Sequence, residues 1–175
     1  MKFKLDNVLK LFFVLVVLSC SDTKTGNQKS ENQQQRDDSL KLKLDVMAYD
    51  KTRLMVETDS VILKWPVYND LKNEINRIEN YTISDVISNI STLEKAIDSL
   101  EKTVPKEVDT FPVMSRVKVL NTKAKHLLML SKKQTPKLKD IKLIAEEIPA
   151  EFNALNIQLN ELFIELPNFE ELNNE

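Results

Sequence analysis

The sequence predicts an all-α protein: an antiparallel bundle of three to four coiled-coil-like helices, preceded by a kinked N-terminal helical arm. Three observations predict this fold class. The chain has a single glycine, Gly26, so nothing after it suits the positive-φ turns of β-hairpins. Apolar residues recur at alternating spacings of three and four, the period of helices packed along one face. Prolines separate these periodic stretches, at positions where helices begin or end.

Residues 1–19 have the pattern of a signal peptide. Eight apolar residues, Leu11 to Leu18, follow Lys2, Lys4 and Lys10. As a helix they would be about 12 Å long, whereas a bilayer core is about 30 Å thick. They are therefore too short to span a membrane, and the basic start, apolar core and small residues at the end are typical of an exported precursor.

Cys20, the only cysteine, ends this stretch in Val17-Leu18-Ser19-Cys20. This tetrapeptide resembles the lipobox of bacterial lipoproteins, with valine in place of the usual leading leucine. The resemblance implies lipidation of the Cys20 thiol, cleavage just before it and acylation of the new amino terminus. Several acyl chains make a lasting anchor, because each buried methylene contributes about 0.8 kcal/mol. The alternative is an ordinary signal peptide with a chance cysteine or an oxidised thiol, although no second cysteine could pair with it.

Residues 20–39 are expected to form a disordered tether behind the acylated cysteine. From Ser21 to Ser39 there is no apolar side chain, so the segment cannot bury enough surface to offset the entropy of ordering it. Such a tether would hold the folded part about 25 Å from the lipid. The alternative is that the cluster of Gln and Asn residues in this segment is a recognition element.

Residues 40–80 are predicted to form the kinked helical arm, with a break after Trp65 caused by Pro66. Lys51 and Thr58 occupy apolar positions of the pattern and weaken it. Two arrangements stay open: a fourth helix folded back on the bundle, or an extended stalk. The apolar positions are Leu40, Leu44, Met47, Leu54, Val61 and Trp65, followed by Tyr68, Leu71, Ile75 and Ile78.

The bundle itself is predicted over residues 81–166, with a tail at 167–175. The first seam is closed by Pro105 and consists of Ile83, Val86, Ile90, Leu93, Ile97, Leu100 and Val104. The second starts near Thr110-Phe111-Pro112 and consists of Val113, Val117, Leu120, Ala124, Leu127 or Leu128, and Ser131. The third consists of Leu138, Ile141, Ala145, Ile148, Phe152, Leu155, Leu159, Leu162 and Leu166.

The last helix has its own boundary signals. We expect Thr135 as its N-cap, Pro136 in its first turn, a bend at Pro149 and an end at Pro167. The short loop from Lys133 to Pro136 makes it an antiparallel neighbour of the preceding helix.

Charge is unevenly distributed along the last two helices. The chain carries 25 basic and 27 acidic side chains, which excludes general polyanion binding by bulk charge, nucleic acid included. Eight basic residues and no acidic one lie between Thr110 and Lys139, while nine acids and only Lys142 follow. Either the two helices complement each other, or the basic face contacts an anionic surface such as phosphate-bearing lipid. The residues proposed for that contact are Arg116, Lys118, Lys123, Lys125, Lys132 and Lys133.

No catalytic residue, metal site or cofactor site is predicted. His126 is the only histidine, which excludes a two-histidine zinc motif and the paired Glu-x-x-His motifs of di-iron bundles. A serine hydrolase would need a glycine elbow, which is missing, and a histidine base near a carboxylate. We therefore expect a protein that is not an enzyme.

The layout resembles the small helical lipoproteins of the bacterial cell envelope, especially the Lys-, Asn- and Glu-rich ones of the Bacteroidota. This implies an exported, lipid-anchored protein with a structural or adaptor role toward an envelope protein, on the outer membrane rather than the inner because Ser21 follows the cysteine. The alternative is an envelope module that holds a small ligand or lipid between helices. An apolar cavity lined by Phe152, Phe163 and methionines would favour a ligand, whereas exposed apolar residues on the arm would favour a protein partner.

The lipobox interpretation predicts the fate of a Cys20→Ala variant. Without the thiol there is no substrate for lipidation, so the uncleaved precursor should accumulate and incorporation of labelled palmitate should fall to background. Gel mobility and metabolic labelling in the native host measure both. Normal cleavage with release of the variant into solution would contradict the interpretation.

Overall fold

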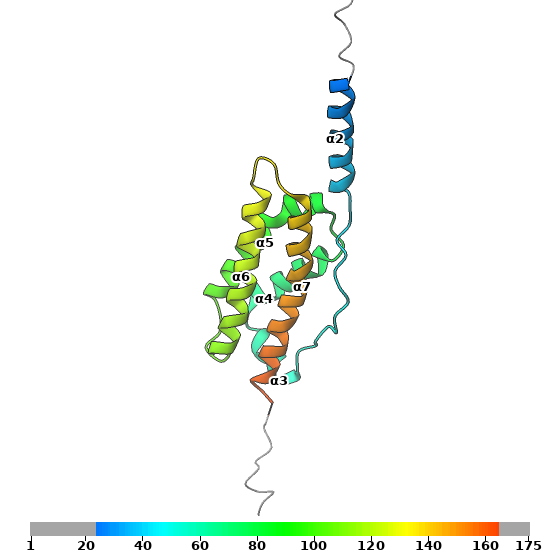
Figure 1. The fold of residues 1–175 in the computed structure, drawn as a ribbon. Helices are drawn as coiled ribbons and strands as arrows, with labels where there is room; N and C mark the ends of the chain where they lie inside the picture. Colours follow the sequence, from blue (N-terminus) through cyan, green and yellow to red (C-terminus); the bar gives the residue numbers. More distant parts are fainter. Residues whose placement is uncertain (1–23, 165–175) are drawn as a thin grey trace, which may run out of the picture. The chain divides into compact units, whose positions relative to one another are not determined.

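The computed structural model describes residues 24–164, with side chains from residue 31 onward. This part of the chain is helical or irregular and contains no strand beyond one isolated bridge pair, Lys43 with Thr82 (Figure 1). No helix among these residues is long and apolar enough to cross a membrane. The chain divides into two units, residues 1–38 and 39–175, which are described separately.

The first unit contains most of helix α2, Lys24–Leu40. The expectation that residues 20–39 lack secondary structure is therefore wrong from Lys24 onward. Lysine, glutamine, glutamate and arginine favour helices, and no β-branched residue occurs between Gly26 and Leu40. Gln34 Nε2 also donates to Asp38 Oδ1, 3.2 Å away and four residues on. None of the side chains described in α2 is fully buried, so local propensity rather than packing accounts for this helix.

The arm is helical only in its second half. Residues 44–55 are extended, and two helices follow: α3, Val56–Ile62, and α4, Pro66–Ile78. The expected break after Trp65 is confirmed, since Trp65 is the N-cap of α4 and Pro66 its first residue. The expectation of a helix from Leu40 to Leu54 is wrong, because the backbone there bonds to distant side chains instead. The arm folds back, and α4 packs against the bundle as its fourth helix.

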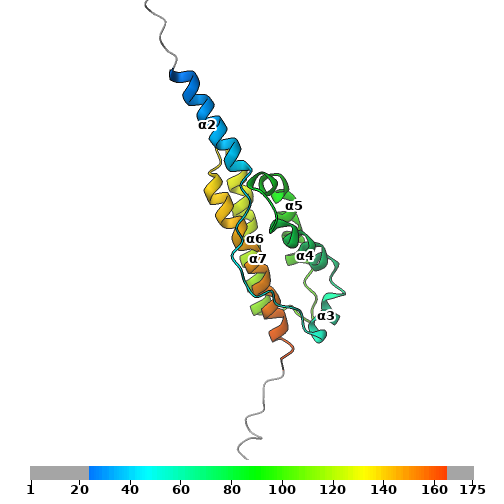
Figure 2. The same cartoon turned by 90° about the vertical axis from the view of Figure 1, so that its right-hand side faces the viewer.

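Three long antiparallel helices complete the bundle: α5, Ile83–Lys102, α6, Phe111–Ser131, and α7, Leu138–Glu161 (Figure 2). α5 begins with a capping box, in which Asp85 N donates to Thr82 Oγ1 at 3.2 Å and Thr82 N donates to Asp85 Oδ2 at 2.8 Å. The buried residues of α5 are the predicted seam, and in α6 Leu127 rather than Leu128 is buried. The predicted all-α bundle is thus confirmed.

The boundaries of α7 differ from the expected ones at its start. Lys137, not Thr135, occupies the N-cap position, and Pro136 precedes the helix. Pro149 lies buried inside a helix that continues past it, as its in-phase seam predicted. Leu166 and Pro167, the expected end of the seam and its stop, lie outside the described residues.

One apolar core joins these helices. It includes Leu44 of the extended segment and the seam residues of α4 to α7. Three aromatic rings run through it from the arm to α7: the ring centroids of Trp65 and Tyr68 are 5.8 Å apart, and those of Tyr68 and Phe152 are 5.3 Å apart. The arm is therefore an integral part of the core rather than an appendage.

Truncation of Leu120 tests this packing. Leu120 is fully buried in α6, so Leu120→Ala should lower the free energy of unfolding by about 2–5 kcal/mol through lost burial and a new cavity. The matched control is Leu143→Ala, because Leu143 is 58% exposed on α7 and its truncation should cost no more than about 0.5 kcal/mol. Urea denaturation followed by circular dichroism measures both. Equal losses would show that the core is not packed as described.

Candidate functional site

The proposed lipidation site, Cys20, lies outside the described residues. The six basic residues proposed for an anionic surface are all described, and they do not form one face. Residues seven apart share a side of a helix, so Arg116 and Lys123 lie on one side of α6, and Lys118, Lys125 and Lys132 lie on another. Lys133 follows the helix, in the loop to α7.

The first side of α6 meets the acidic residues of α7. Lys123 Nζ lies 2.8 Å from Glu147 Oε2 and 2.8 Å from Glu151 Oε1. Burial lowers the pKa of the Lys123 ammonium, but the two carboxylates outweigh it and the net shift is upward. Lys123 therefore contributes to the charge complementarity between α6 and α7.

The second side of α6 borders α5. Asn121 Nδ2 donates to Glu101, and Lys125 Nζ lies 3.6 Å from Asp98 Oδ1. Lys102 and Lys125 lower the pKa of Asp98, chiefly through the hydrogen bond from Lys102. His126, the next residue after Lys125, is exposed. Arg116, Lys118, Lys132 and Lys133 are exposed and form no ion pair with any described residue.

The extended segment 44–55, called the strap below, is held along α7 by a row of side chains. Thr52 N donates to Asn153 Oδ1 at 2.7 Å, while Asn153 Nδ2 donates to Asp50 O at 3.1 Å. Asn160 repeats this arrangement: Met55 N donates to its Oδ1 at 2.9 Å, and its Nδ2 donates to Arg53 O at 2.8 Å. Each amide thus pairs with a carbonyl and with the N–H two residues later.

The spacing of the two asparagines matches the strap. Seven residues of α-helix rise about 10.5 Å, and three residues of extended chain, Thr52 to Met55, cover about 10 Å. One helical repeat earlier, Glu146 accepts a hydrogen bond from Asp45 N. Residues 146, 153 and 160 therefore form a ladder at heptad spacing that supplies partners for the strap backbone.

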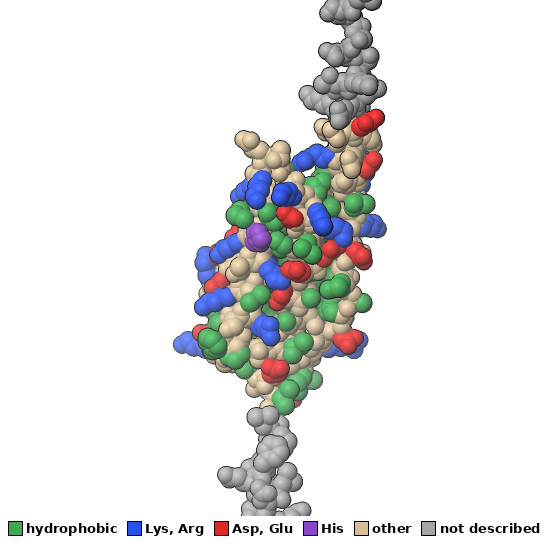
Figure 3. Space-filling view, viewed as in Figure 1, with side chains coloured by type: hydrophobic (Ala, Val, Ile, Leu, Met, Phe, Trp, Pro, Cys, Tyr) green, Lys and Arg blue, Asp and Glu red, His purple; other side chains and the backbone are tan. Residues whose placement is uncertain are grey.

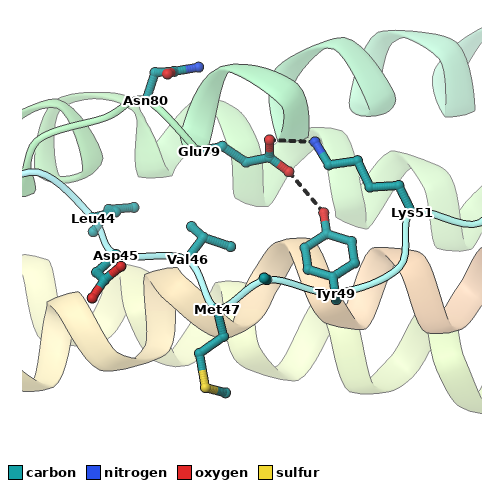
Figure 4. Close-up of a pocket in the computed structure, with 9 residues that line it drawn as sticks. Leu44, Asp45, Val46, Met47, Tyr49, Lys51, Glu79 and Asn80 are labelled. Carbon is teal, nitrogen blue, oxygen red and sulfur yellow. Dashed lines mark hydrogen bonds and ion pairs between the residues drawn. The ribbon is translucent and has the colours of Figure 1, made fainter.

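Between its contacts with Glu146 and Asn153 the strap bows away from α7 toward the end of α4. Tyr49 OH donates to Glu79 Oε1 at 2.8 Å, and Lys51 Nζ contacts Glu79 Oε2 at 2.5 Å, with both side chains pointing to one carboxylate (Figure 4). Burial, and then the bond to Glu79, raise the pKa of Tyr49. A pocket of about 350 Å³ lies here, lined by residues 44–49, Lys51, Glu79 and Asn80.

A larger hollow of about 560 Å³ lies between the strap, α4 and α7. Tyr68, Ile75 and Phe152 contribute its apolar part, and Tyr68 OH donates to Asn156 Oδ1 at 2.6 Å. Burial, and then the charge of Asp59, raise the pKa of Tyr68. The rest of the lining is largely polar or charged, including Arg53, Asp59, Lys72 and Asn153. Neither Phe163 nor a methionine belongs to it, so it is not the apolar cavity that the ligand interpretation requires.

The two ends of the bundle differ. We call proximal the end where Leu42 O accepts from Ile83 N and where the loop 132–137 joins α6 to α7. The distal end holds α3, the start of α6 and the end of α7: Met55 N bonds Asn160, and Trp65 Nε1 donates to Thr103 Oγ1 at 3.0 Å. Large apolar side chains are exposed at the distal end: Val56 at 82%, Leu63 at 70%, Phe111 at 87% and Ile164 at 51%.

No family model matches this chain, and neither the curated proteins nor the solved structures contain a match. Function therefore has to be argued from the described residues, among which no cluster of histidine, cysteine, aspartate and glutamate could hold a metal ion. The ladder was not predicted from the sequence. Its signal was the heptad spacing of Asn153 and Asn160 beside an apolar seam, where an amide that is buried, as that of Asn160 is, needs partners.

Removal of one amide tests the ladder. Asn160→Ala leaves Met55 N and Arg53 O without their partners, so we expect a loss of about 1–3 kcal/mol in unfolding free energy and faster amide hydrogen exchange at Met55. The control is Asn76→Ala, because Asn76 is exposed on α4 and its side chain forms no hydrogen bond with a described residue. Unchanged exchange at Met55 in Asn160→Ala would rule out the ladder.

Proposed function

We propose that this protein is a lipid-anchored helical adaptor of the bacterial cell envelope, which contacts an envelope protein through the distal end of its bundle. The anchor is the acylated Cys20 that the lipobox resemblance implies. The observation that carries the adaptor role is the exposure of Val56, Leu63 and Phe111 at that end. Exposed apolar residues gathered in one region are typical of interaction sites, whereas single exposed apolar residues scattered over a surface are normal.

The fold accounts for this gathering. Because α5, α6 and α7 are antiparallel, the end of α5, the start of α6 and the end of α7 meet at the distal end. The strap delivers α3 to the same place, through the contact of Met55 with Asn160. Figure 3 shows hydrophobic side chains at this end of the bundle. Exposed apolar residues far apart in sequence thus share one region of the surface.

The charges around these side chains indicate what kind of partner fits. Five exposed acids lie at the distal end, against four exposed basic residues, of which Lys102 is paired with Asp98. The acids are Glu57, Asp59, Glu107, Asp109 and Glu161, and the basic residues are Arg53, Lys64, Lys102 and Lys106. An acidic rim around apolar residues complements a protein surface with an apolar ridge flanked by lysine or arginine. It offers an anionic lipid surface no net attraction, so the distal end is better suited to a protein than to the membrane.

Photocrosslinking in intact cells tests the adaptor role. A photoreactive amino acid replaces Leu63 or Phe111 in the full chain, and the control positions are Met129 and Leu143, which are 54% and 58% exposed at the proximal part of α6 and α7. We expect the same protein adduct from both distal positions and not from the controls. A further variant, Glu107→Lys with Asp109→Lys, should reduce the adduct at Leu63 at least fivefold by removing the acidic rim.

Two results would overturn this function. One is the absence of any adduct at both distal positions when the chain is present at its native level. The other is an identical adduct pattern at all four positions, which would mean that exposure alone determines capture.

A further inference from the structure

We propose that the proximal end of the bundle binds a phosphate-bearing membrane surface through six lysines. Four of them, Lys132, Lys133, Lys137 and Lys139, lie in or beside the loop between α6 and α7, and Lys41 and Lys43 lie where the chain joins the bundle. We call these six residues the basic tip. The inference deepens the proposed function, because it rests on lipid anchoring to bring this end near a membrane.

The cations of the basic tip are not used within the bundle. All six are exposed, and none forms an ion pair with a described residue. This separates them from Lys123 and Lys125 of the same basic block, which pair with α7 and α5. Of the six residues proposed from sequence for the anionic contact, two keep that assignment, since Lys132 and Lys133 belong to the tip. Lys123 belongs instead to the α6–α7 contact and Lys125 to the α5–α6 contact. Arg116 and Lys118 are exposed on α6, outside the tip.

Folding does not explain where two of these lysines stand. Lys137 is the N-cap of α7 and Lys139 lies in its first turn. The helix dipole disfavours cations at an N-terminus, and a lysine N-cap provides no side-chain acceptor for the free N–H groups. A serine or aspartate would stabilise the helix more. A role outside the fold accounts for cations in these positions.

The chain from Cys20 enters the bundle at the proximal end. The hydrogen bonds Leu44 N to Tyr81 O, 2.9 Å, and Ile83 N to Leu42 O, 3.0 Å, hold the chain at the start of α5. Everything N-terminal to Leu42, including Cys20, is therefore joined to the bundle at this end. Four acids share it, Asp45, Glu79, Asp85 and Asp140, of which Glu79 is bonded to Tyr49 and Lys51 and Asp85 to its capping box. Six cations outnumber them, while acids outnumber cations at the distal end.

The physical effect is orientation. A lysine near an anionic leaflet strengthens binding about fivefold, and the attraction falls off within about 10 Å. Six lysines on one end can therefore hold the bundle with that end toward the lipid, which leaves the acidic, apolar distal end pointing away. Anchoring by acyl chains alone would not select an orientation.

Vesicle binding by the unacylated chain, Ser21–Glu175, tests this. That chain keeps every residue of the described core, which runs from Leu44 to Leu159. The probes are vesicles of neutral phosphatidylcholine and vesicles with 30% phosphatidylglycerol, in sedimentation assays at low salt. We expect binding only to the anionic vesicles, lost in 0.5 M sodium chloride.

Two quadruple variants separate the tip from bulk charge. The tip variant changes four lysines of the basic tip to glutamine: Lys132, Lys133, Lys137 and Lys139. The control variant makes the same change at Lys64, Lys72, Lys106 and Lys118, which are also exposed and form no ion pair within the described part of the chain. Both lose four positive charges. The tip variant should bind anionic vesicles at least tenfold more weakly and the control less than threefold, with circular dichroism confirming that both fold.

Three results would overturn the inference. The first is an equal loss of vesicle binding in both variants, and the second is equal binding of the unchanged chain to neutral and anionic vesicles. The third is tighter binding of soluble polyphosphate than of anionic vesicles, which would assign the tip to a soluble polyanion. The assay uses no acyl chain and no protein partner. Its failure would therefore leave the adaptor role intact, and failure of the crosslinking experiment would leave the basic tip intact.

Discussion

The pairing of two asparagine side chains with an extended backbone is the interaction on which the arrangement of this bundle depends. The chain joins the bundle at the proximal end but must start α4 at the distal end. It covers that distance as the strap, whose N–H and C=O groups would be costly if they were buried without partners. Asn153 and Asn160 of α7 supply those partners, each bonding one carbonyl and one N–H. α7 thus packs the core with one face and holds the strap with the next.

The chain, which is almost free of glycine, reverses its direction through wide connections between its helices. No described residue has positive φ, glycine included. Tight reversals of the kind that glycine permits are therefore not used in this part of the chain, and wider connections replace them. The linker between α4 and α5 closes on the Thr82 capping box, and the one between α6 and α7 takes six residues. Within the core, the ring contacts of Trp65 with Tyr68 and of Tyr68 with Phe152 join the arm to α7.

The sequence predicted what depends on local period and could not predict what depends on distant contacts. The seams of α5, α6 and α7 were readable because a buried helical face imposes its spacing on the apolar residues. The strap was not, since its extended shape depends on side chains about a hundred residues later. α2 was missed for another reason: low hydrophobicity argues against a packed core, but it does not prevent a helix built of good helix formers.

The candidate sites show the same division. A block of eight basic residues was visible in the sequence, but helical geometry distributes it over two sides of α6 and a loop. Only the structure shows that Lys123 and Lys125 are paired and that the lysines of the loop are not. The apolar residues of the distal end could not be recognised either, because Val56, Leu63 and Phe111 come from separate stretches that only the antiparallel fold brings to one end.

The resulting polarity comes from side chains at the ends of the bundle and not from the helix topology. In an antiparallel bundle, adjacent helix ends carry opposite dipoles that largely cancel, so the helices alone give the two ends no net difference in charge. The difference between a cationic proximal end and an acidic, apolar distal end must therefore come from side chains in the loops and caps. Those positions contribute least to the core, and their composition is the freest to serve contacts outside the bundle. For this chain, function is best sought at the two ends of the bundle rather than along its packed seams.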